Sequence, residues 1–374
     1  MRRLMAMIKK ELIQMRRDPV TLAISIFAPL LMLLLYGYGI NFDIRHIPMT
    51  ICDQDQTQES RDFLTDFPSD YFNVVGITND PDALDTELDT GHSRIVLWIP
   101  HGFGKAMSAG RQGQIYAGID GADANTANVS LGYLNTIVKQ RSNRIYLTRL
   151  QRKIGITPHM PLDFTARVWY NPELKSSHFL IPGLVAVLLM MVTTLLTAMT
   201  ITNEKENNTI EQLVASPIHP IELMLGKMIP CVLSSSLGVL LVIVIGRRVF
   251  EVPLKGDLVT LVVSCLLYLM TSLGLGLLIS TVSKTQQAAM TIAGTTTMLP
   301  SVLLSGYIYP IANMPAFIQL FTFLVPARYF IIILRGIFLK GVGFAVLWPQ
   351  LLGLGLIATF FTVISASRFH KRLE

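Results

Sequence analysis

The sequence predicts an α-helical protein that crosses a membrane several times and carries one α/β domain outside it. Of its 374 residues, 51% are hydrophobic and only 15% are charged, whereas a soluble domain averages about 25% charged residues. Six apolar runs reach the roughly 20 residues that a helix needs to cross the hydrocarbon core. The longest polar interval, 41–177, alternates strand-like and helix-like segments, which is typical of a small α/β domain.

The predicted spans are separated by short polar connections everywhere except after the first. In order, they are Val20–Ile40, His178–Ile201, Leu225–Ile245, Leu258–Val282, Ala288–Tyr307 and Phe344–Ala366. Two further apolar runs, Ala316–Leu324 and Tyr329–Leu339, are too short to cross and are bracketed by prolines, which end helices. Residues 308–342 are therefore predicted to form an outer re-entrant segment before the last span.

Basic residues in the short flanks predict the sidedness of the chain. Arg16 and Arg17 precede the first span, and Arg372 follows the last. Six spans place both termini on one side, the cytoplasm, and leave the pair at 247–248 as an exception outside. The predicted parts are a cytoplasmic helix at 1–18, the first span at 19–40, the outer domain at 41–177, and the remaining spans at 178–374 with a cytoplasmic loop at 202–224.

The N-terminal segment is predicted to be an amphipathic helix that lies in the membrane interface. At about 100° per residue, one narrow stripe collects its apolar residues Leu4, Ile8, Leu12 and Met15. The opposite side is basic, and Asp18-Pro19 ends the helix. The same charges would also serve as a plain topology signal. Contact with membrane lipid is therefore expected here.

The predicted outer domain alternates four strands with three short helices. The strands are "IPMTIC", "FNVVGI", "SRIVLWI" and "QIYAGID", and the helices are "QESRDFLTDF", "PDALDTELDTG" and "GFGKAMSAG". A long helix, Ala124–Ile154, follows, with Asn125 or Thr126 as its expected cap, and "DFTARVWY" is predicted as a last strand. This long helix has a basic surface, interpreted as a solvated face or as a contact for lipid headgroups or a partner protein.

No catalytic or metal-binding cluster is recognisable in the sequence. The carboxylates of "DQDQ", Asp53 and Asp55, lack a partner acid or histidine and are interpreted as a strand-end turn. "DGADAN" lacks the spacing of a calcium loop, and "HGFGK" lacks the remaining residues of a phosphate-binding loop. Three scattered cysteines predict no disulfide framework. A membrane enzyme and a nucleic-acid-binding protein are accordingly disfavoured, and this chain is expected to bind no cofactor of its own.

The cytoplasmic loop contains the stretch "NEKENNTIEQLVASP". Thr209 and Gln212 form a capping box, Glu211 lies in the first turn, and Pro217 stops the helix after about two turns. Glu204 and Glu206 are expected to extend its exposed acidic surface. Because an isolated helix this short is unstable in water, the sequence predicts that the loop docks on its own bundle or on a partner protein.

Two predicted spans have mildly polar faces. Met190, Thr193, Thr197 and Thr200 share one face of the second span, and Thr291, Thr295, Met298 and Ser305 share one face of the fifth. Such walls suit an amphipathic or lipophilic substrate. Helix–helix packing explains small and hydroxylated residues equally well, so both interpretations stay open.

Three stretches resemble the permease subunits of ABC-2 type exporters, most closely the bacterial multidrug-efflux-like branch with a large periplasmic domain. "KKELIQMRRDP" is similar to the family's elbow helix, with Lys10, Glu11, Arg17, Asp18 and Pro19. "NEKENNTIEQLVASPI" is similar to its E-x-E-x-G-T-x-E-x-L-x-x-x-P loop. "LLSGYIYPIANMP" with "VPARYFIIILRGIFLKG" resembles its re-entrant segment. The matching loop positions are Glu204, Glu206, Thr209, Glu211, Leu213 and Pro217, with Asn208 replacing the usual glycine.

The resemblance implies a membrane subunit of an ATP-driven exporter in the bacterial inner membrane. The loop would be the coupling helix read by a separate ABC ATPase, which would hold ATP and Mg²⁺. Two permease chains, identical or related, would pair, and a periplasmic adaptor and an outer-membrane channel are possible further partners. The substrate would be drug-like or lipophilic. The competing hypothesis is a membrane-anchored receptor or scaffold that works through its periplasmic domain.

Overall fold

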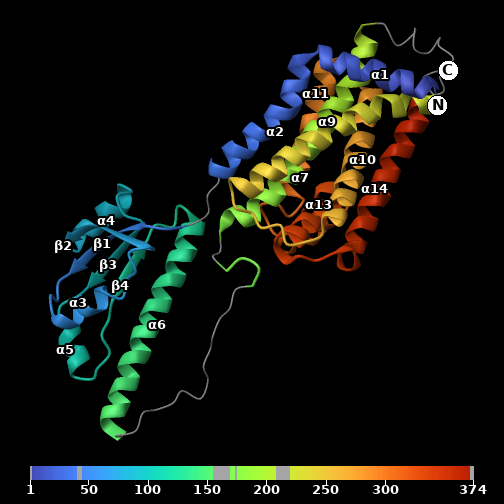
Figure 1. The fold of residues 1–374 in the computed structure, drawn as a ribbon. Coiled ribbons are helices and arrows are strands. Elements are labelled where there is room, and N and C mark those ends of the chain that lie inside the picture. Colours follow the sequence, from blue (N-terminus) through green and yellow to red (C-terminus); the bar gives the residue numbers. More distant parts are fainter. Residues whose placement is uncertain (1, 40–43, 155–168, 173–174, 208–219, 371–374) are drawn as a thin grey trace. The chain divides into compact units, whose positions relative to one another are not determined.

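The computed structural model describes residues 2–39, 44–154, 169–172, 175–207 and 220–370 of the chain (Figure 1). These residues form two compact units. One contains residues 42–167, and the other combines residues 1–41 with residues 168–374. The first is an α/β unit and the second is a helical bundle, which confirms the coarse fold class that the sequence predicts.

The α/β unit is built on a four-stranded sheet with the order β2-β1-β3-β4. Strand β1 pairs in parallel with β2 and β3, whereas β4 is antiparallel to β3. The strands are β1 Ile47–Asp53, β2 Phe72–Thr78, β3 Ile95–Ile99 and β4 Tyr116–Ile119, and the helices are α3 Gln58–Leu64, α4 Asp82–Asp89, α5 Phe103–Ser108 and α6 Ala124–Ile154. The predicted last strand at 163–170 lies largely outside the described residues.

The core of this unit lies where α3, α5 and the first half of α6 contact the sheet. Met49, Ile95 and Ile99 are fully buried in the strands, and Leu134 and Ile137 contribute from α6. The expected cap of α6 is wrong by two or three residues: the Asp123 carboxylate accepts hydrogen bonds from the backbone N–H of Asn125 and from the Thr126 hydroxyl. A carboxylate in the residue just before the helix satisfies its free amides better than a side chain inside the first turn.

The "DQDQ" turn after β1 holds the start of α5 in place. Asp55 accepts hydrogen bonds from the backbone N–H of Gly102 and Gly104 at 2.8 and 2.7 Å, and from the Thr57 hydroxyl at 2.6 Å. Burial raises the pKa of Asp55, but these hydrogen bonds outweigh it and lower the pKa below its ordinary value. The expected strand-end turn is therefore present and also joins β1 to α5.

We expect Asp55→Asn to destabilise the α/β unit by about 1 kcal/mol at neutral pH, the usual cost of losing a capping carboxylate. Because the folded-state pKa of Asp55 is lowered, its stabilisation is complete above about pH 4 and is lost as the pH falls through the folded-state value. Thermal unfolding of the full chain can be followed by circular dichroism. The unfolding midpoint of the variant should be lower than that of the wild type at pH 7, and the two midpoints should coincide near pH 3. Asp89→Asn, an exposed change on α4, serves as the control that should leave both melting curves unchanged.

The helical bundle is arranged around α7, which lies among the other long helices in Figure 1. Its apolar window is 83% buried, and it contacts α2, α9, α10, α11 and α13. The elements are α1 Arg2–Arg17, α2 Pro19–Gly39, α7 Ser176–Glu206, α9 Pro220–Arg248, α10 Leu258–Val282, α11 Gln286–Leu303, α12 Ala316–Thr322, α13 Pro326–Arg335, a π-helical turn Gly336–Lys340 and α14 Phe344–His370. Gly276 permits close packing of α10 on α7, because a Cβ there would lie 2.7 Å from the Thr194 carbonyl oxygen.

Among the described residues, four helices are long and apolar enough to cross a membrane: α7, the Leu225–Arg248 part of α9, α10 and the Phe344–Ser367 part of α14. A fifth candidate is the pair formed by Ala316–Thr322 and Pro326–Lys340, which is bent by 82° and is either a broken span or a re-entrant loop. The chain is therefore a polytopic membrane protein. The count of six spans, which also includes α2 and α11, stays a prediction.

The bundle adds detail at two predicted segments. Residues 202–206 of the predicted cytoplasmic loop 202–224 continue α7, and α9 begins at Pro220. On α1, Met7 and Glu11 are buried, whereas Leu12 of the predicted apolar stripe is 39% exposed. Met7 packs on α9, since a Cβ at Gly226 would lie 2.5 Å from Met7 Cγ. Contact of the apolar stripe with lipid stays a prediction.

Candidate coupling site at the end of α7

Four charged residues from three helices meet at the end of α7. Lys10 Nζ on α1 lies 2.8 Å from Glu204 Oε1 on α7 and 3.1 Å from Glu11 Oε1. Lys227 Nζ on α9 lies 3.2 Å from Glu11 Oε1 and 3.3 Å from Glu204 Oε1. Each ammonium contacts both carboxylates, so the charges alternate and sum to zero. We refer to Lys10, Glu11, Glu204 and Lys227 as the ionic cluster.

The ionic cluster is mostly shielded from solvent. The side chains of Lys227, Glu11 and Glu204 are 4%, 9% and 10% exposed, whereas Lys10 is 43% exposed. Burial lowers the pKa of Lys10, but its contacts with Glu204 and Glu11 outweigh this effect and the pKa is raised, so Lys10 is cationic at neutral pH. Buried charges of this kind hold one geometry, because removal of one partner leaves the other uncompensated.

The next two residues of α7 contact the ends of two further helices. Lys205 Nζ donates to the carbonyl oxygens of Ser280, Thr281 and Ser283 at the C-terminal end of α10. Glu206 Oε2 accepts from the backbone N–H of Gln286 at the start of α11, at 3.1 Å. A cation at a helix C-terminus and an anion at a helix N-terminus are the favourable arrangement for the helix dipole. The last turn of α7 therefore contacts α1, α9, α10 and α11.

The structure brings together residues that the sequence assigns to separate motifs. Lys10 and Glu11 of the predicted elbow helix contact Glu204 of the predicted loop motif. The expectation that Glu204 extends an exposed acidic surface is wrong, because its carboxylate is needed to pair with two ammonium groups inside the bundle. Arg17 is exposed at the end of α1, with Asp18 between α1 and α2 and Pro19 at the start of α2. The loop residues Asn208, Thr209, Glu211, Leu213 and Pro217 lie outside the described residues.

Lys227 is the member of the ionic cluster that sequence reasoning missed. It lies near the start of the third predicted span, where the apolar composition hides a single lysine. The available signal was general: an ionisable residue within an apolar run usually faces the protein interior and pairs with an opposite charge. Its partners could not be named, because the nearest, Glu11, is on a different helix and far away in the sequence.

The two mildly polar faces have different surroundings. On α7, Met190, Thr193 and Thr197 are nearly fully buried, and Thr200 is partly buried. On α11, Thr291, Thr295 and Met298 are exposed on the surface of the chain. Ser305, which lies beyond the C-terminal end of α11, is buried. Most of these hydroxyls donate to the carbonyl oxygen four residues earlier, as those of Thr197, Thr200, Thr291 and Thr295 do. Their assignment to a pathway stays a prediction.

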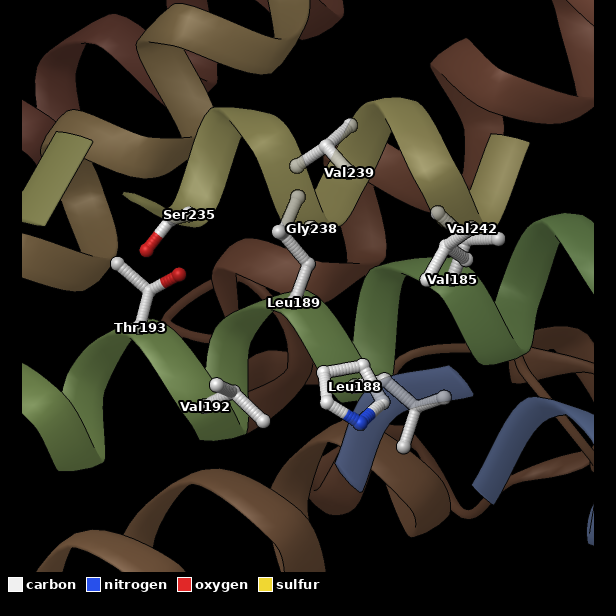
Figure 2. Close-up of a pocket in the computed structure, with 10 residues that line it drawn as sticks. Val185, Leu188, Leu189, Val192, Thr193, Ser235, Gly238, Val239 and Val242 are labelled. Carbon is white, nitrogen blue, oxygen red and sulfur yellow. The ribbon is translucent and has the colours of Figure 1, made fainter. Parts of the chain in front are cut away.

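Thr193 faces Ser235 across a pocket between α7 and α9 (Figure 2). The lining is otherwise apolar and includes Pro29 of α2, Val185 and Val239. Within the described residues, neither the Thr193 nor the Ser235 hydroxyl has a hydrogen-bond partner. The cavity volume of about 20 Å³ has room for about one water molecule. A drug-sized molecule would need α7 and α9 to move apart before it could enter.

A bundle of apolar helices with an inserted α/β unit and a buried, ion-paired helix junction defines a polytopic membrane protein. The chain belongs to the ABC-2 family of transporter proteins, whose family profile matches residues 19–367. Membership implies an ABC ATPase partner and a dimeric permease arrangement.

The relatives include three permeases of Escherichia coli strain K12. The probable multidrug ABC transporter permease YbhS is 33% identical over 374 residues, which cover 100% of this chain and 98% of YbhS. The probable multidrug ABC transporter permease YbhR is 28% identical, with 99% and 98% covered. The inner membrane transport permease YhhJ is 27% identical, with 87% and 86% covered. The chain is therefore a multi-pass inner-membrane transporter subunit rather than an enzyme.

Proposed function

We propose that this chain is the permease subunit of an ATP-driven exporter that moves a drug-like or lipophilic substrate out of the cytoplasm or the inner leaflet. A separate ATPase subunit would hold ATP and Mg²⁺ and would act on the loop at 208–219. The observation that carries the proposal is the last turn of α7, which directly precedes this loop and contacts four other helices through Lys205, Glu206 and the ionic cluster. A force on the loop would reach all of them at once.

The proposal also includes both termini in the cytoplasm, six spans, and a pair of permease chains. The similarity to the probable multidrug ABC transporter permeases YbhS and YbhR supports the substrate class. The proposal extends to a periplasmic adaptor and an outer-membrane channel as further partners, which copurification with the complex would detect.

A transport assay tests the direction and the energy source. The permease and its ATPase are reconstituted together in proteoliposomes with ATP outside, so that correctly inserted complexes carry the substrate inward. We expect a fluorescent lipophilic dye to accumulate in the lumen with ATP and Mg²⁺, and to remain at background when a non-hydrolysable nucleotide replaces ATP. Equal accumulation with both nucleotides would contradict the proposal.

A further inference from the structure

The α/β unit contains a groove that the transport function leaves unused. It lies between α3, α5 and the second half of α6 and has a volume of about 860 Å³. This value falls in the range of about 300–1,000 Å³ that is usual for small-molecule sites. All of its lining residues belong to one compact unit, so the groove is a property of this unit alone.

The base of the groove rests on the core of the unit. Phe63 and Phe103 are 2% and 6% exposed, so their rings offer almost no surface to a ligand. Met107 and Ile145 are half-buried and form the apolar surface that a ligand can reach. This small apolar surface between α5 and α6 fits the apolar part of an amphipathic molecule.

One wall of the groove is strongly basic. Four arginines of α6 line it, namely Arg141, Arg144, Arg149 and Arg152. Two of them, Arg141 and Arg144, share the single carboxylate of Asp66 at 3.2 and 3.3 Å, so this pair keeps one net positive charge. Arg149 donates to the Met107 carbonyl oxygen, which fixes its guanidinium beside α5 without cancelling its charge.

Arg152 is the cation best placed to contact a ligand. It is exposed, and among the described residues no carboxylate lies within ion-pair distance of it. The lining carboxylates of Glu59 and Asp62 accept hydrogen bonds from the neutral Ser108 hydroxyl and Gln58 amide and keep their negative charges. Four arginines set against Glu59, Asp62 and Asp66 leave this region with one net positive charge, and Arg149 and Arg152 have no carboxylate paired with them among the described residues.

We propose that this groove binds a small amphipathic organic anion, with its apolar body on Met107 and Ile145 and its anionic group at Arg149 and Arg152. Guanidinium groups match the planar, bidentate geometry of carboxylates, sulfonates and phosphates. The volume of the groove is that of a small-molecule site. The site is independent of ATP and of the loop at 208–219, so its failure would leave the coupling proposal intact.

Isothermal titration of the full-length chain in a neutral detergent tests the site, with 2-naphthalenesulfonate as the probe. We expect saturable binding of one probe per chain that weakens as salt is added. The cation 2-naphthylmethylammonium has the same aromatic body and should bind at least about tenfold more weakly, the equivalent of one charge-assisted hydrogen bond.

Three variants distinguish a built site from non-specific adsorption. Arg152→Gln should weaken binding of the sulfonate by about tenfold, and Ala109→Trp should abolish it by filling the groove without changing any charge. Arg45→Gln removes one exposed positive charge of the same unit that is not part of the groove lining, and it should leave binding unchanged. Equal affinity for the anion and the cation, or equal losses in Arg152→Gln and Arg45→Gln, would overturn the proposal. Binding that is unchanged in Ala109→Trp would overturn it as well.

Discussion

Replacement of Glu204 by lysine is expected to destabilise the helical bundle by about 3–5 kcal/mol, the usual cost of breaking a buried ion pair. Glu204 is the carboxylate that Lys10 and Lys227 share, at 2.8 and 3.3 Å. The variant would bring three ammonium groups together with only Glu11 to compensate them. Thermal unfolding of the purified chain in detergent should show a clearly lower midpoint for Glu204→Lys than for the wild type. Glu204→Gln removes the charge but keeps hydrogen-bonding capacity, so its midpoint should lie between those of the wild type and Glu204→Lys.

Glu206→Lys is the matched control for this experiment. It makes the same charge reversal two residues later on α7, where the side chain is exposed and contacts the first amides of α11. Loss of a favourable helix-dipole contact costs only about 0.3–1 kcal/mol. A Glu204→Lys protein that unfolds at the same temperature as Glu206→Lys would show that the ionic cluster does not hold α1, α7 and α9 together.

The sequence was sufficient for those parts of the fold that depend on local pattern. The alternation of strands and helices in the α/β unit follows from short apolar runs separated by turn residues. The end of α1 at Arg17 follows from Asp18-Pro19, because proline restricts the residue before it and cannot donate a backbone hydrogen bond. Long apolar runs likewise predicted α7, α10 and α14 within a few residues.

Features that depend on distant partners could not be predicted in this way. Lys10 and Glu204 are separated by 194 positions, and neither the spacing nor the composition around either residue names the other. The same limit explains α1, whose buried face includes Met7 because Gly226 of α9 leaves room for it. The parallel register of β1 with β2 and β3 also comes from three-dimensional packing, although the element order made it the expected arrangement.

Glu211→Lys is expected to uncouple the permease from its ATPase while leaving the bundle folded. The proposed role of Glu211 is an acidic contact in the first turn of the helix that the sequence predicts in this loop, where a carboxylate also favours the helix dipole. Reversing a charge at a docking surface turns attraction into repulsion, at a cost of several kcal/mol. Substrate-stimulated ATP hydrolysis by the copurified complex should therefore fall by at least about tenfold, with no change in the thermal unfolding midpoint of the permease.

The comparison with Glu204→Lys distinguishes a loss of coupling from a loss of stability. If the ionic cluster and the loop form one mechanical unit, Glu204→Lys lowers both stability and ATP hydrolysis, whereas Glu211→Lys lowers hydrolysis alone. Glu251→Lys is a control with the same change of charge at an exposed side chain that forms an ion pair with Lys175 at 3.3 Å. The complex that contains this variant should hydrolyse ATP at the wild-type rate. Full turnover in Glu211→Lys would place the coupling contact elsewhere, because a loop that carries force cannot tolerate repulsion at the point where the force enters.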